Sequence, residues 1–366
     1  MDLFHADAFE ELSLADTLDD WLTLMATGGD QLLDLAVLCQ IFRPNARPEL
    51  LCEEFDLFGM PEYFVRKYMR FRNAHDVMTM CDLLQMPAEM QAANGTKTSG
   101  LEVLCIVLRR LAYPCRFADL CAIFPRNEPE LCLLFNLGIH HIYDNFHHKL
   151  TAFNQPWVAA PELLRYCQAI ARKGAPLQNC WGFIDGTVRP MCRPGQHQRE
   201  VFNGHKRVHG LKFQSIVIPN GLIANLHGPI EGRRHDSALL TASGAMQYME
   251  ANCNIDGAPL CVYGDPAYPL RPHLHRPHRG NNLTREQQQF NTDMSSVRQA
   301  VEWGFQKITT EWAFLDFKKN LKLFLSPVGK LYMVGALLAN CHTCMYGSEV
   351  ASYFELNPPS VEDCMR

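Results

Sequence analysis

Three acidic residues, Asp185, Asp265 and Glu302, have the type and order that could support metal-ion chemistry. Asp185 ends an apolar run that begins at Cys180, and Asp265 ends a second apolar run that begins at Leu260. A buried strand does not accommodate an unpaired charge, so each Asp is expected at an open strand end where a cation can reach it. Three facing carboxylates repel one another unless cations lie between them, which predicts two Mg²⁺ or Mn²⁺ ions.

Each carboxylate also has a simpler explanation when it is considered alone. An Asp followed by Gly after a strand, as in Asp185-Gly186, is most often an ordinary turn. Glu302 lies one helical turn after Arg298, and Arg-Glu pairs at this spacing are usually surface ion pairs. The second strand that ends in an Asp, followed by a helix with a Glu, favours the metal-site hypothesis over these alternatives.

The elements that would position the carboxylates follow one another in the second half of the chain. A strand ending at Asp185 is followed by two β runs around Asn220-Gly221, which are typical of a hairpin. A helical stretch and the strand ending at Asp265 come next, and a helix that starts near residues 293–295 carries Glu302. If the first and fourth strands are neighbours in one mixed sheet, both Asp side chains meet at one edge, where a crossing helix can add the Glu.

Four short motifs in this region resemble, in the same order, those of the PIF/Harbinger transposase group of DDE-superfamily endonucleases. They are residues 184–187 (IDGT), 234–237 (RHDS), 264–270 (GDPAYPL) and 298–305 (RQAVEWGF). The resemblance covers about residues 175–345 and implies an α/β, RNase H-like fold with a mixed five-stranded sheet flanked by helices. It also implies that Asp185, Asp265 and Glu302 are the catalytic metal ligands, and that Asp185 bridges both ions.

Further residues and a partner are assigned by the same resemblance. We expect His235, Asp236 and Arg298 to support the metal ligands or to contact DNA. Trp303 follows the Glu where a basic residue is more usual in the family. The family further implies a separate Myb-like DNA-binding partner protein, and the Lys residues of 318–322 are too few to predict a nuclear-localisation signal. We therefore expect a nuclear protein that is imported with its partner.

The net charge of −5 conceals an asymmetry between the two ends of the chain. Residues 1–60 contain thirteen Asp and Glu against two Arg, whereas residues 181–330 contain eighteen Lys and Arg against twelve Asp and Glu. Local basic surface, rather than the charge of the whole chain, sets the affinity for phosphate. The side chains expected to hold DNA phosphates are Arg189, Arg193, Lys206, Arg207, Arg233, Arg234, Arg271 and Arg279.

A proline-rich stretch after the second Asp contains His273, His275 and His278. The prolines break any regular metal-ligand spacing, so a loop that faces DNA explains these histidines better than a zinc site does. Cys341 and Cys344 lie in an apolar helix without a second pair nearby, which favours core packing over metal or redox chemistry.

The first half of the chain is predicted to be helical. Residues 1–95 combine apolar residues at helical spacing with an acidic face and form an acidic helical N-terminal region. After a loop around Asn94-Gly95, residues 96–174 contain three short helices with tight turns, which suit a helix-turn-helix arrangement. The first starts at Ser99, the second runs from Arg116 to Phe124, and the third starts near Asn127. A connector with a helix from about Pro161 to Arg172 follows. A small helical bundle used only for packing explains the three short helices equally well. Residues 175–346 form the nuclease domain, and residues 347–366 a loosely ordered tail.

The compartment is indicated by the cysteines and by the apolar runs. Fifteen cysteines are scattered through apolar runs, where free buried thiols belong, so we expect a reducing compartment. The longest uncharged apolar stretch near the C-terminus, Leu331 to Cys341, is too short to cross a bilayer, and no membrane association is expected.

These observations predict a metal-dependent DNA transposase or transposase-derived endonuclease. It would cut transposon ends with water and join the freed 3′-hydroxyls to target DNA, and the handling of two ends predicts a homodimer. The rival hypothesis is a domesticated protein that no longer cleaves and uses the fold as a DNA- or protein-interaction scaffold. Facing carboxylates without metal are costly, which counts against this rival. An RNase H-like nuclease that acts on RNA or branched DNA is a third alternative.

Overall fold

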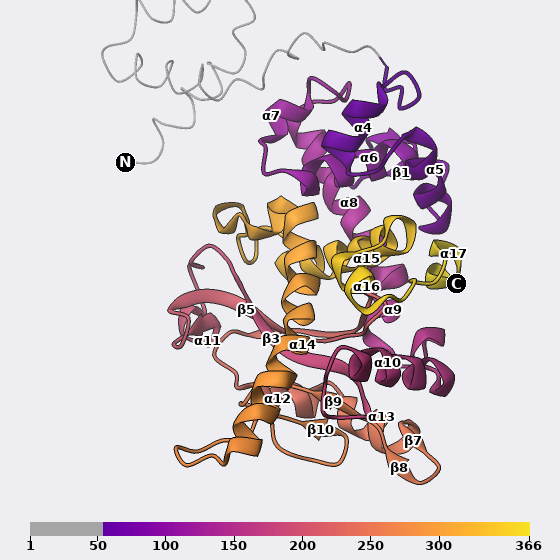
Figure 1. Cartoon of the computed structure of the whole chain (residues 1–366). Coiled ribbons are helices and arrows are strands. Elements are labelled where there is room, and N and C mark those ends of the chain that lie inside the picture. Colours follow the sequence, from indigo (N-terminus) through magenta and orange to yellow (C-terminus); the bar gives the residue numbers. More distant parts are fainter. Residues whose placement is uncertain (1–53) are drawn as a thin grey trace, which may run out of the picture. The chain divides into compact units, whose positions relative to one another are not determined.

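The computed structural model describes residues 54–366, which form one compact α/β unit with a central sheet and many helices (Figure 1). The acidic helices expected within residues 1–53 lie outside the described residues. The domain boundaries expected at residues 95 and 174 fall inside this unit, because helices before and after them share one buried core.

Within residues 54–366, the largest sheet has six strands. They are β3 (Cys180–Pro190), β4 (Phe202–Asn203), β5 (Val208–Val217), β6 (Ile223–Glu231), β9 (Cys261–Tyr263) and β10 (Leu274–His275). The order is β10, β9, β3, β5, and both β4 and β6 pair with β5. β3 runs parallel to β9 and antiparallel to β5, so the sheet is mixed and the first and fourth predicted strands are neighbours, as expected. The sixth strand, β4, is too short for an alternating sequence pattern to reveal it.

Four more strands form two small ladders away from this sheet. They are β1 (Met90–Gln91), β2 (Lys97–Thr98), β7 (Asn254–Ile255) and β8 (Ala258–Pro259). β1 pairs with β2 and β7 with β8, both antiparallel, and the loop predicted around Asn94-Gly95 is the turn between β1 and β2.

The predicted hairpin around Asn220-Gly221 joins β5 to β6 and is confirmed. Gly221 has a φ of 88°, a left-handed conformation that glycine adopts at little cost. The N–H of Ile218 donates to the carbonyl of Leu222 at 3.1 Å, and the N–H of Leu222 donates to Asn220 Oδ1 at 3.1 Å. These hydrogen bonds close the turn and fix how the two strands are aligned.

Helices between residues 62 and 146 lie together at one end of the unit, in indigo and purple in Figure 1. They are α4 (Glu62–Met69), α5 (Ala74–Leu83), α6 (Gly100–Ala112), α7 (Phe117–Leu120) and α8 (Glu128–Phe146). Ser99 and Asn127 cap α6 and α8, because each side-chain oxygen accepts from the N–H three residues later, at 3.1 and 3.0 Å. Both predicted helix starts are confirmed, whereas α7 is a single turn and ends four residues before the predicted end at Phe124.

Helix α8 would be the recognition helix of a helix-turn-helix, but it is built into the core. Its apolar side packs on α6 and on α15 (Val328–Tyr346). Two of its polar side chains also make internal contacts. His141 Nε2 lies 3.0 Å from the carbonyl of Leu84, and Asp144 Oδ1 lies 2.7 Å from Lys330 Nζ. The packing favours the helical-bundle explanation of this region.

A connecting segment leads from α8 to the sheet. It contains α9 (His148–Thr151), the 3-10 turn η1 (Pro156–Val158) and α10 (Ala160–Arg172). α10 closely matches the helix predicted between Pro161 and Arg172, and its apolar face packs on β3.

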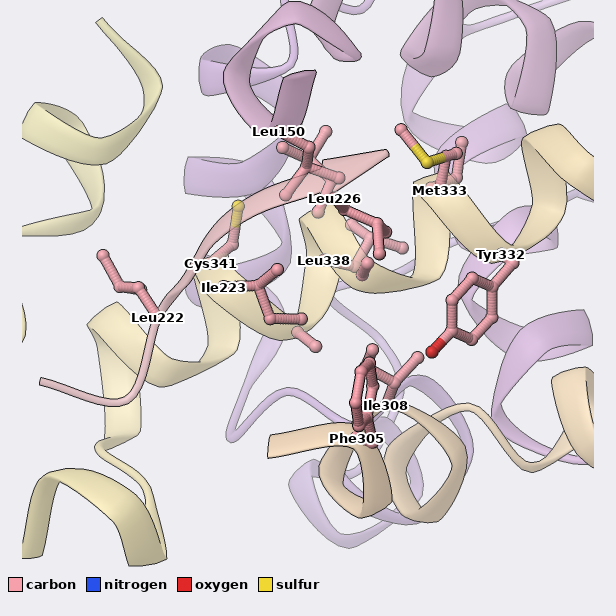
Figure 2. Close-up of a cluster of buried hydrophobic side chains, with 14 of the residues drawn as sticks. Leu150, Leu222, Ile223, Leu226, Phe305, Ile308, Tyr332, Met333, Leu338 and Cys341 are labelled. Atoms are coloured by element: carbon pink, nitrogen blue, oxygen red, sulfur yellow. The ribbon is translucent and has the colours of Figure 1, made fainter. Parts of the chain in front are cut away.

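Helix α15 packs both on β6 of the sheet and on α14 (Arg285–Glu311). Figure 2 shows Leu338 of α15 close to Leu226 of β6, and Tyr332 of α15 close to Phe305 and Ile308 of α14. All five side chains are buried. The apolar helix predicted to contain Cys341 and Cys344 is confirmed, and burial of the Cys341 thiol fits core packing.

The segment after residue 347 is not a loosely ordered tail. It forms α16 (Glu349–Phe354) and α17 (Val361–Met365), and both pack on the helices before them. Ser348 and Ser360 cap these helices, and Phe354 and Cys364 are almost fully buried. Short helices of one or two turns give little periodic signal, which explains the wrong prediction.

The short elements that remain complete the fold. They are α11 (Gln198–Val201), α12 (Asp236–Ala242), α13 (Ala245–Asn252), η2 (Ala313–Asp316) and η3 (Lys318–Asn320). None of the helices in the described part of the chain is long and apolar enough to cross a membrane. The cysteines of this part are free thiols, and most are buried.

Candidate functional site

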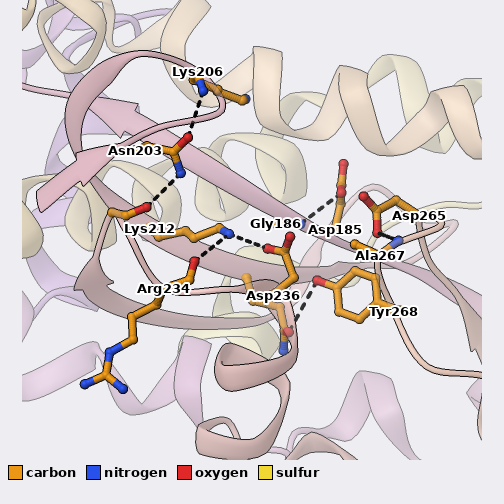
Figure 3. Close-up of polar contacts among 12 residues, drawn as sticks. Asp185, Gly186, Asn203, Lys206, Lys212, Arg234, Asp236, Asp265, Ala267 and Tyr268 are labelled. Carbon is orange, nitrogen blue, oxygen red and sulfur yellow. Dashed lines mark hydrogen bonds and ion pairs between the residues drawn. The ribbon is translucent and has the colours of Figure 1, made fainter. Parts of the chain in front are cut away.

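The parallel pairing of β3 with β9 places Asp185 beside Asp265. The register pairs Phe183 with Tyr263, the last residue of β9, and each Asp follows its paired residue by two positions. Residues two positions apart in a strand point to the same face. Figure 3 shows both carboxylates at the same end of the two strands. The structure thus brings together two of the three predicted metal ligands.

Asp185 lies within β3, and the prediction that the strand ends there is wrong. β3 continues to Pro190, and residues 185–190 pair only with β5, because β9 has ended at Tyr263. The charge therefore sits at an open edge of the strand rather than at its end. An Asp-Gly dipeptide is a typical turn signal, and pairing with β5 overrides it here.

Asp185 makes two polar contacts. Its Oδ1 accepts from the N–H of Gly186 at 2.9 Å, and its Oδ2 lies 3.0 Å from Nη2 of Arg298. Burial raises the pKa of the Asp185 carboxyl above its ordinary value, Arg298 and the Gly186 N–H oppose that shift, and the charges of Asp265 and Asp236 add to it. Asp185 is therefore the centre of a group of three carboxylates with one arginine.

Asp236, the first residue of α12, approaches this site from the loop after β6. Its Oδ1 lies 2.8 Å from Nζ of Lys212, which also donates to the carbonyl of Arg234 at 3.0 Å (Figure 3). Lys212 is buried on β5, and its ammonium group holds both the loop and the carboxylate in place. No predicted motif includes Lys212, although a lone Lys in the apolar run of residues 211–218 is a signal that could identify it.

Tyr268, from the GDPAYPL motif, forms another side of the site. It is buried, and its hydroxyl donates to Gln214 Oε1 at 3.3 Å. Burial raises the pKa of the phenol well above its ordinary value, and the charges of Asp236, Asp185 and Asp265 raise it further. The phenol is therefore protonated, and it adds no negative charge to the three carboxylates.

Gly186 leaves the space that Asp236 occupies. A Cβ at position 186 would lie 2.4 Å from Asp236 Oδ1, much closer than van der Waals contact allows. Gly186→Ala is therefore expected to displace Asp236 from Lys212 and to lower the unfolding free energy by about 1–3 kcal/mol. Urea denaturation measures this loss.

The matched control for this substitution is Gly204→Ala. A Cβ added at Gly204 would point into open space, with nothing within 4 Å, and Gly204 does not have a positive φ. We expect Gly204→Ala to change stability by less than about 0.5 kcal/mol. Equal losses for the two variants would show that contact with Asp236 does not explain the glycine at position 186.

Glu302 lies on α14, apart from the other two predicted ligands. Its side chain is exposed, and four residues earlier Arg298 pairs with Asp185 rather than with Glu302. α14 begins at Arg285, capped by Thr284, well before the predicted start near residue 293, because the polar first turns hide the helical period. Within residues 54–366 no group of three or more His, Cys, Asp or Glu side chains is placed to hold a metal ion.

The side chains expected to bind phosphate are mostly on the surface. Those of Arg193, Lys206, Arg207, Arg233, Arg234, Arg271 and Arg279 are exposed. Arg189 is an exception, because it is partly buried and its guanidinium lies 4.8 Å from the centroid of the Tyr332 ring. Arg189 thus packs against α15 and is less accessible than the other cations, and its contact with phosphate stays a prediction. His235 is exposed just before α12.

The histidine-rich stretch is only partly a surface loop. His273 is buried, with its Nδ1 2.7 Å from the carbonyl of Leu260, and His275 belongs to β10, which pairs with β9. His278 is exposed. The stretch therefore supplies the outer strand of the sheet next to Asp265, and the prediction of a DNA-facing loop is wrong for its first two histidines.

The donor atoms at the site fit a divalent cation in kind. Carboxylate oxygens are the ligands that Mg²⁺ and Mn²⁺ prefer, and Asp185 and Asp265 present such oxygens side by side. Nearby negative charge is balanced by Arg298 on one side and by Lys212 on the other. The arrangement can therefore attract a cation, while Glu302 stands apart from the pair.

Comparison with known proteins matches part of the chain to a protein family. Residues 184–340 match the family model described as DDE superfamily endonuclease, a segment that contains Asp185, Asp236, Asp265 and Glu302. We found no matching curated protein and no matching solved structure. The region that holds the carboxylates is thus similar to the endonucleases of the DDE superfamily. This confirms the resemblance to the superfamily and points to nuclease or transposase chemistry. The PIF/Harbinger subgroup stays a prediction.

Proposed function

We propose that this protein is a metal-dependent DNA transposase of the PIF/Harbinger type. It would cut transposon ends by hydrolysing phosphodiester bonds and join the 3′-hydroxyl ends to target DNA. The observation that carries the proposal is the adjacency of Asp185 and Asp265 inside the segment that matches the DDE superfamily endonucleases. DNA is the substrate expected of such a domain.

The order of the strands supports an RNase H-like fold for this domain. β3, β5 and β6 form an antiparallel meander, and β9 and β10 then add in parallel on the other side of β3. The mixed sheet therefore has Asp185 on an inner strand and Asp265 just after the neighbouring parallel strand. This is the placement that the resemblance implies for the first two ligands.

Asp185, Asp265 and Glu302 are the residues that we propose hold two Mg²⁺ or Mn²⁺ ions. Residues four positions apart lie on the same side of a helix, so Arg298 and Glu302 share one side of α14. Because Arg298 reaches Asp185, that side faces the carboxylate pair. Asp236 is a weaker candidate for the third ligand, since Lys212 already pairs with it.

Each group has a part in the proposed reaction. Asp185, Asp265 and Glu302 would hold the two divalent cations, which when bound would activate an attacking water and stabilise the leaving oxygen of the displacement. The backbone of β3 fixes Asp185, and the Gly186 N–H orients its Oδ1. Exposed cations such as Arg233 and Arg271 would hold DNA phosphates and so place the scissile bond.

We further propose a homodimer that acts in the nucleus with a Myb-like partner. Two DNA ends must be held together for joining, and two copies of the site satisfy that need. α8 is the helix that the sequence offers for reading DNA, but it packs into the core. This packing supports a separate protein that recognises the DNA sequence.

Nicking of supercoiled plasmid tests the proposed activity. The purified chain is expected to relax the plasmid in Mg²⁺ or Mn²⁺ and to be inactive in EDTA. Joining is tested by incubating the chain and a Myb-like partner with a labelled, pre-cut transposon end and target plasmid. Relaxation that is equally fast in EDTA would contradict the metal-dependent mechanism.

Arg298→Met tests the charge balance at Asp185 without measuring cleavage. The variant keeps a long side chain but leaves Asp185 with only negative neighbours. The side chains of Arg298 and Asp185 are 22% and 21% exposed, so solvent screens the pair in part. The substitution should therefore lower the unfolding free energy of the metal-free protein by about 2 kcal/mol, which is less than the loss expected when a fully buried ion pair is broken. Millimolar Mg²⁺ should restore more stability to the variant than it adds to the wild type.

The control is Arg285→Met, an exposed cation at the start of the same helix. It should change stability by less than about 0.5 kcal/mol and should not alter the response to Mg²⁺. Similar unfolding curves for the two variants, with and without Mg²⁺, would contradict a role of Arg298 in balancing the charge of Asp185.

A further inference from the structure

Helix α4 and the turn after it carry a cluster of positive charge outside the nuclease motifs. Four of the seven residues from 66 to 72 are cations, namely Arg66, Lys67, Arg70 and Arg72. The nearest acidic residues in the sequence are Glu62 and Asp76. Arg66, Lys67 and Arg72 are exposed, and Tyr63, one turn before the cluster, is 69% exposed. This stretch is a basic, aromatic surface within a region whose sequence is otherwise acidic.

The cluster is anchored firmly to the rest of the unit. Arg70 Nε donates to the carbonyl of Glu311 at 3.2 Å, and its Nη2 donates to the carbonyl of Ala112 at 3.2 Å. The guanidinium of Arg72 lies 4.5 Å from the centroid of the Tyr346 ring. Arg70 and Arg72 therefore start from fixed positions, which reduces the entropy lost when this part of the cluster binds a ligand.

A buried arginine adds to this charge. Arg109 of α6 is only 7% exposed, and its guanidinium lies 4.8 Å from the centroid of the Tyr68 ring. Its Nε and Nη1 have no hydrogen-bond partner within residues 54–366. In the same part of the chain, none of the five cations, including Arg109, forms an ion pair with a carboxylate. No carboxylate therefore neutralises this charge, and the exposed Arg66, Lys67 and Arg72 can contact an anionic ligand directly.

Helix α14 connects this cluster to the carboxylates. Arg70 contacts Glu311 at the last residue of α14, and Glu302 and Arg298 lie nine and thirteen residues before it. At about 1.5 Å per residue, these positions are about 14 and 20 Å from the contact with Arg70. Figure 1 shows α14 extending from the sheet toward the end of the unit that contains α4. That separation corresponds to roughly four to six base pairs of duplex DNA.

We propose that the α4 basic surface, formed by Arg66, Lys67, Arg70 and Arg72, binds the phosphate backbone of duplex DNA about five base pairs from the scissile bond. The exposed Arg66, Lys67 and Arg72 contact phosphates, and the buried Arg109 adds positive charge behind them. The position of the scissile bond rests on the proposed function, whereas binding of the duplex does not. Unpaired Lys and Arg side chains hold phosphates without reading base sequence, so this surface fixes where the duplex lies. In the helical region, DNA is held by α4 rather than by the buried α8.

The test is binding of a blunt duplex of about two helical turns, in EDTA, across a series of salt concentrations. The variant Arg66→Gln/Lys67→Gln changes two exposed side chains and should keep the melting temperature of the wild type. Fluorescence anisotropy should show the slope of log K against log salt falling by about 2, and the affinity at low salt falling about tenfold or more. Addition of Arg72→Gln should lower the slope by about 1 more.

The matched control is Lys97→Gln/Arg165→Gln, which removes the same charge. These exposed side chains already pair with Glu89 and Glu162, and their loss should leave the slope unchanged. A wild-type slope for the α4 variant, or an equal fall for the control, would overturn the proposal. The proposal would also be overturned if the α4 variant bound duplex normally but no longer bound vesicles of anionic phospholipid.

This assay separates the two proposals because EDTA prevents metal-dependent cleavage. A chain that binds duplex through the α4 basic surface but never cuts it would refute the proposed function and support this inference. If the wild-type chain cuts DNA but the α4 variant binds duplex as tightly as the wild type does, the proposed function is supported and this inference is refuted.

Discussion

Asp185→Asn is expected to reduce metal-dependent DNA cleavage by on the order of 10³-fold or more while the protein stays folded. Asn has the shape of Asp and can still accept the hydrogen bond from the Gly186 N–H. It lacks the negative charge that holds a divalent cation, and the neutral side chain is easier to bury. The rate of plasmid nicking in Mg²⁺ measures the loss, and a thermal unfolding curve confirms that the fold is retained.

Asp256→Asn is the control for this substitution. Asp256 is exposed in the turn between β7 and β8 with a φ of 51°, a conformation that Asn also adopts readily. Glu302→Gln should match the loss seen for Asp185→Asn, whereas Glu286→Gln, exposed on the same helix, should cleave normally. If Glu302→Gln retained activity while Asp185→Asn lost it, Glu302 would not be the third ligand and Asp236 would take its place.

Glu102→Ala is expected to lower the unfolding free energy by about 3 kcal/mol. Glu102 is buried near the start of α6, where its two carboxylate oxygens lie 3.1 and 3.2 Å from Nε and Nη2 of Arg126. The hydroxyl of Thr98 also donates to Glu102. Removal of the carboxylate leaves the Arg126 guanidinium largely buried without its counter-charge, which is the costly outcome for a buried pair. Urea denaturation at neutral pH measures the change.

Glu162→Ala serves as the comparison, because Glu162 pairs with Arg165 on the surface of α10. That exposed pair should contribute less than about 1 kcal/mol. Glu102→Gln should fall between the two, since Gln can still accept from Thr98 and contact Arg126 without the charge. A loss for Glu102→Ala as small as that for Glu162→Ala would contradict the importance of this buried pair.

The sequence predicts the core of the nuclease domain because strong local signals agree with the tertiary structure there. Apolar runs before Asp185 and Asp265 identify two buried strands, and the Asn220-Gly221 turn identifies the hairpin. Adjacency of the two Asp residues follows from the order of the elements once the first and fourth strands pair. Ser99 and Asn127 mark helix starts because capping is a local property of the chain.

Other features depend on contacts that no local pattern contains. β3 continues past Asp185 because it pairs with β5 there, and His275 belongs to a strand because β10 pairs with β9. The partner of Arg298 is Asp185, more than a hundred residues away, although Glu302 is the nearer acidic residue in sequence. The lone Lys in residues 211–218 marks Lys212 as unusual, but its role at the site becomes clear only from its contact with Asp236.

Binding of Mn²⁺ followed by electron paramagnetic resonance tests the central claim most directly, because it measures the proposed metal site without DNA or cleavage. Asp185 is the ligand proposed to contact both ions, and its neighbours Asp265 and Asp236 supply further negative charge. We predict two bound ions per chain for the wild type and none for Asp185→Asn. Equal binding of Mn²⁺ by the wild type and by Asp185→Asn would contradict a metal site built on Asp185.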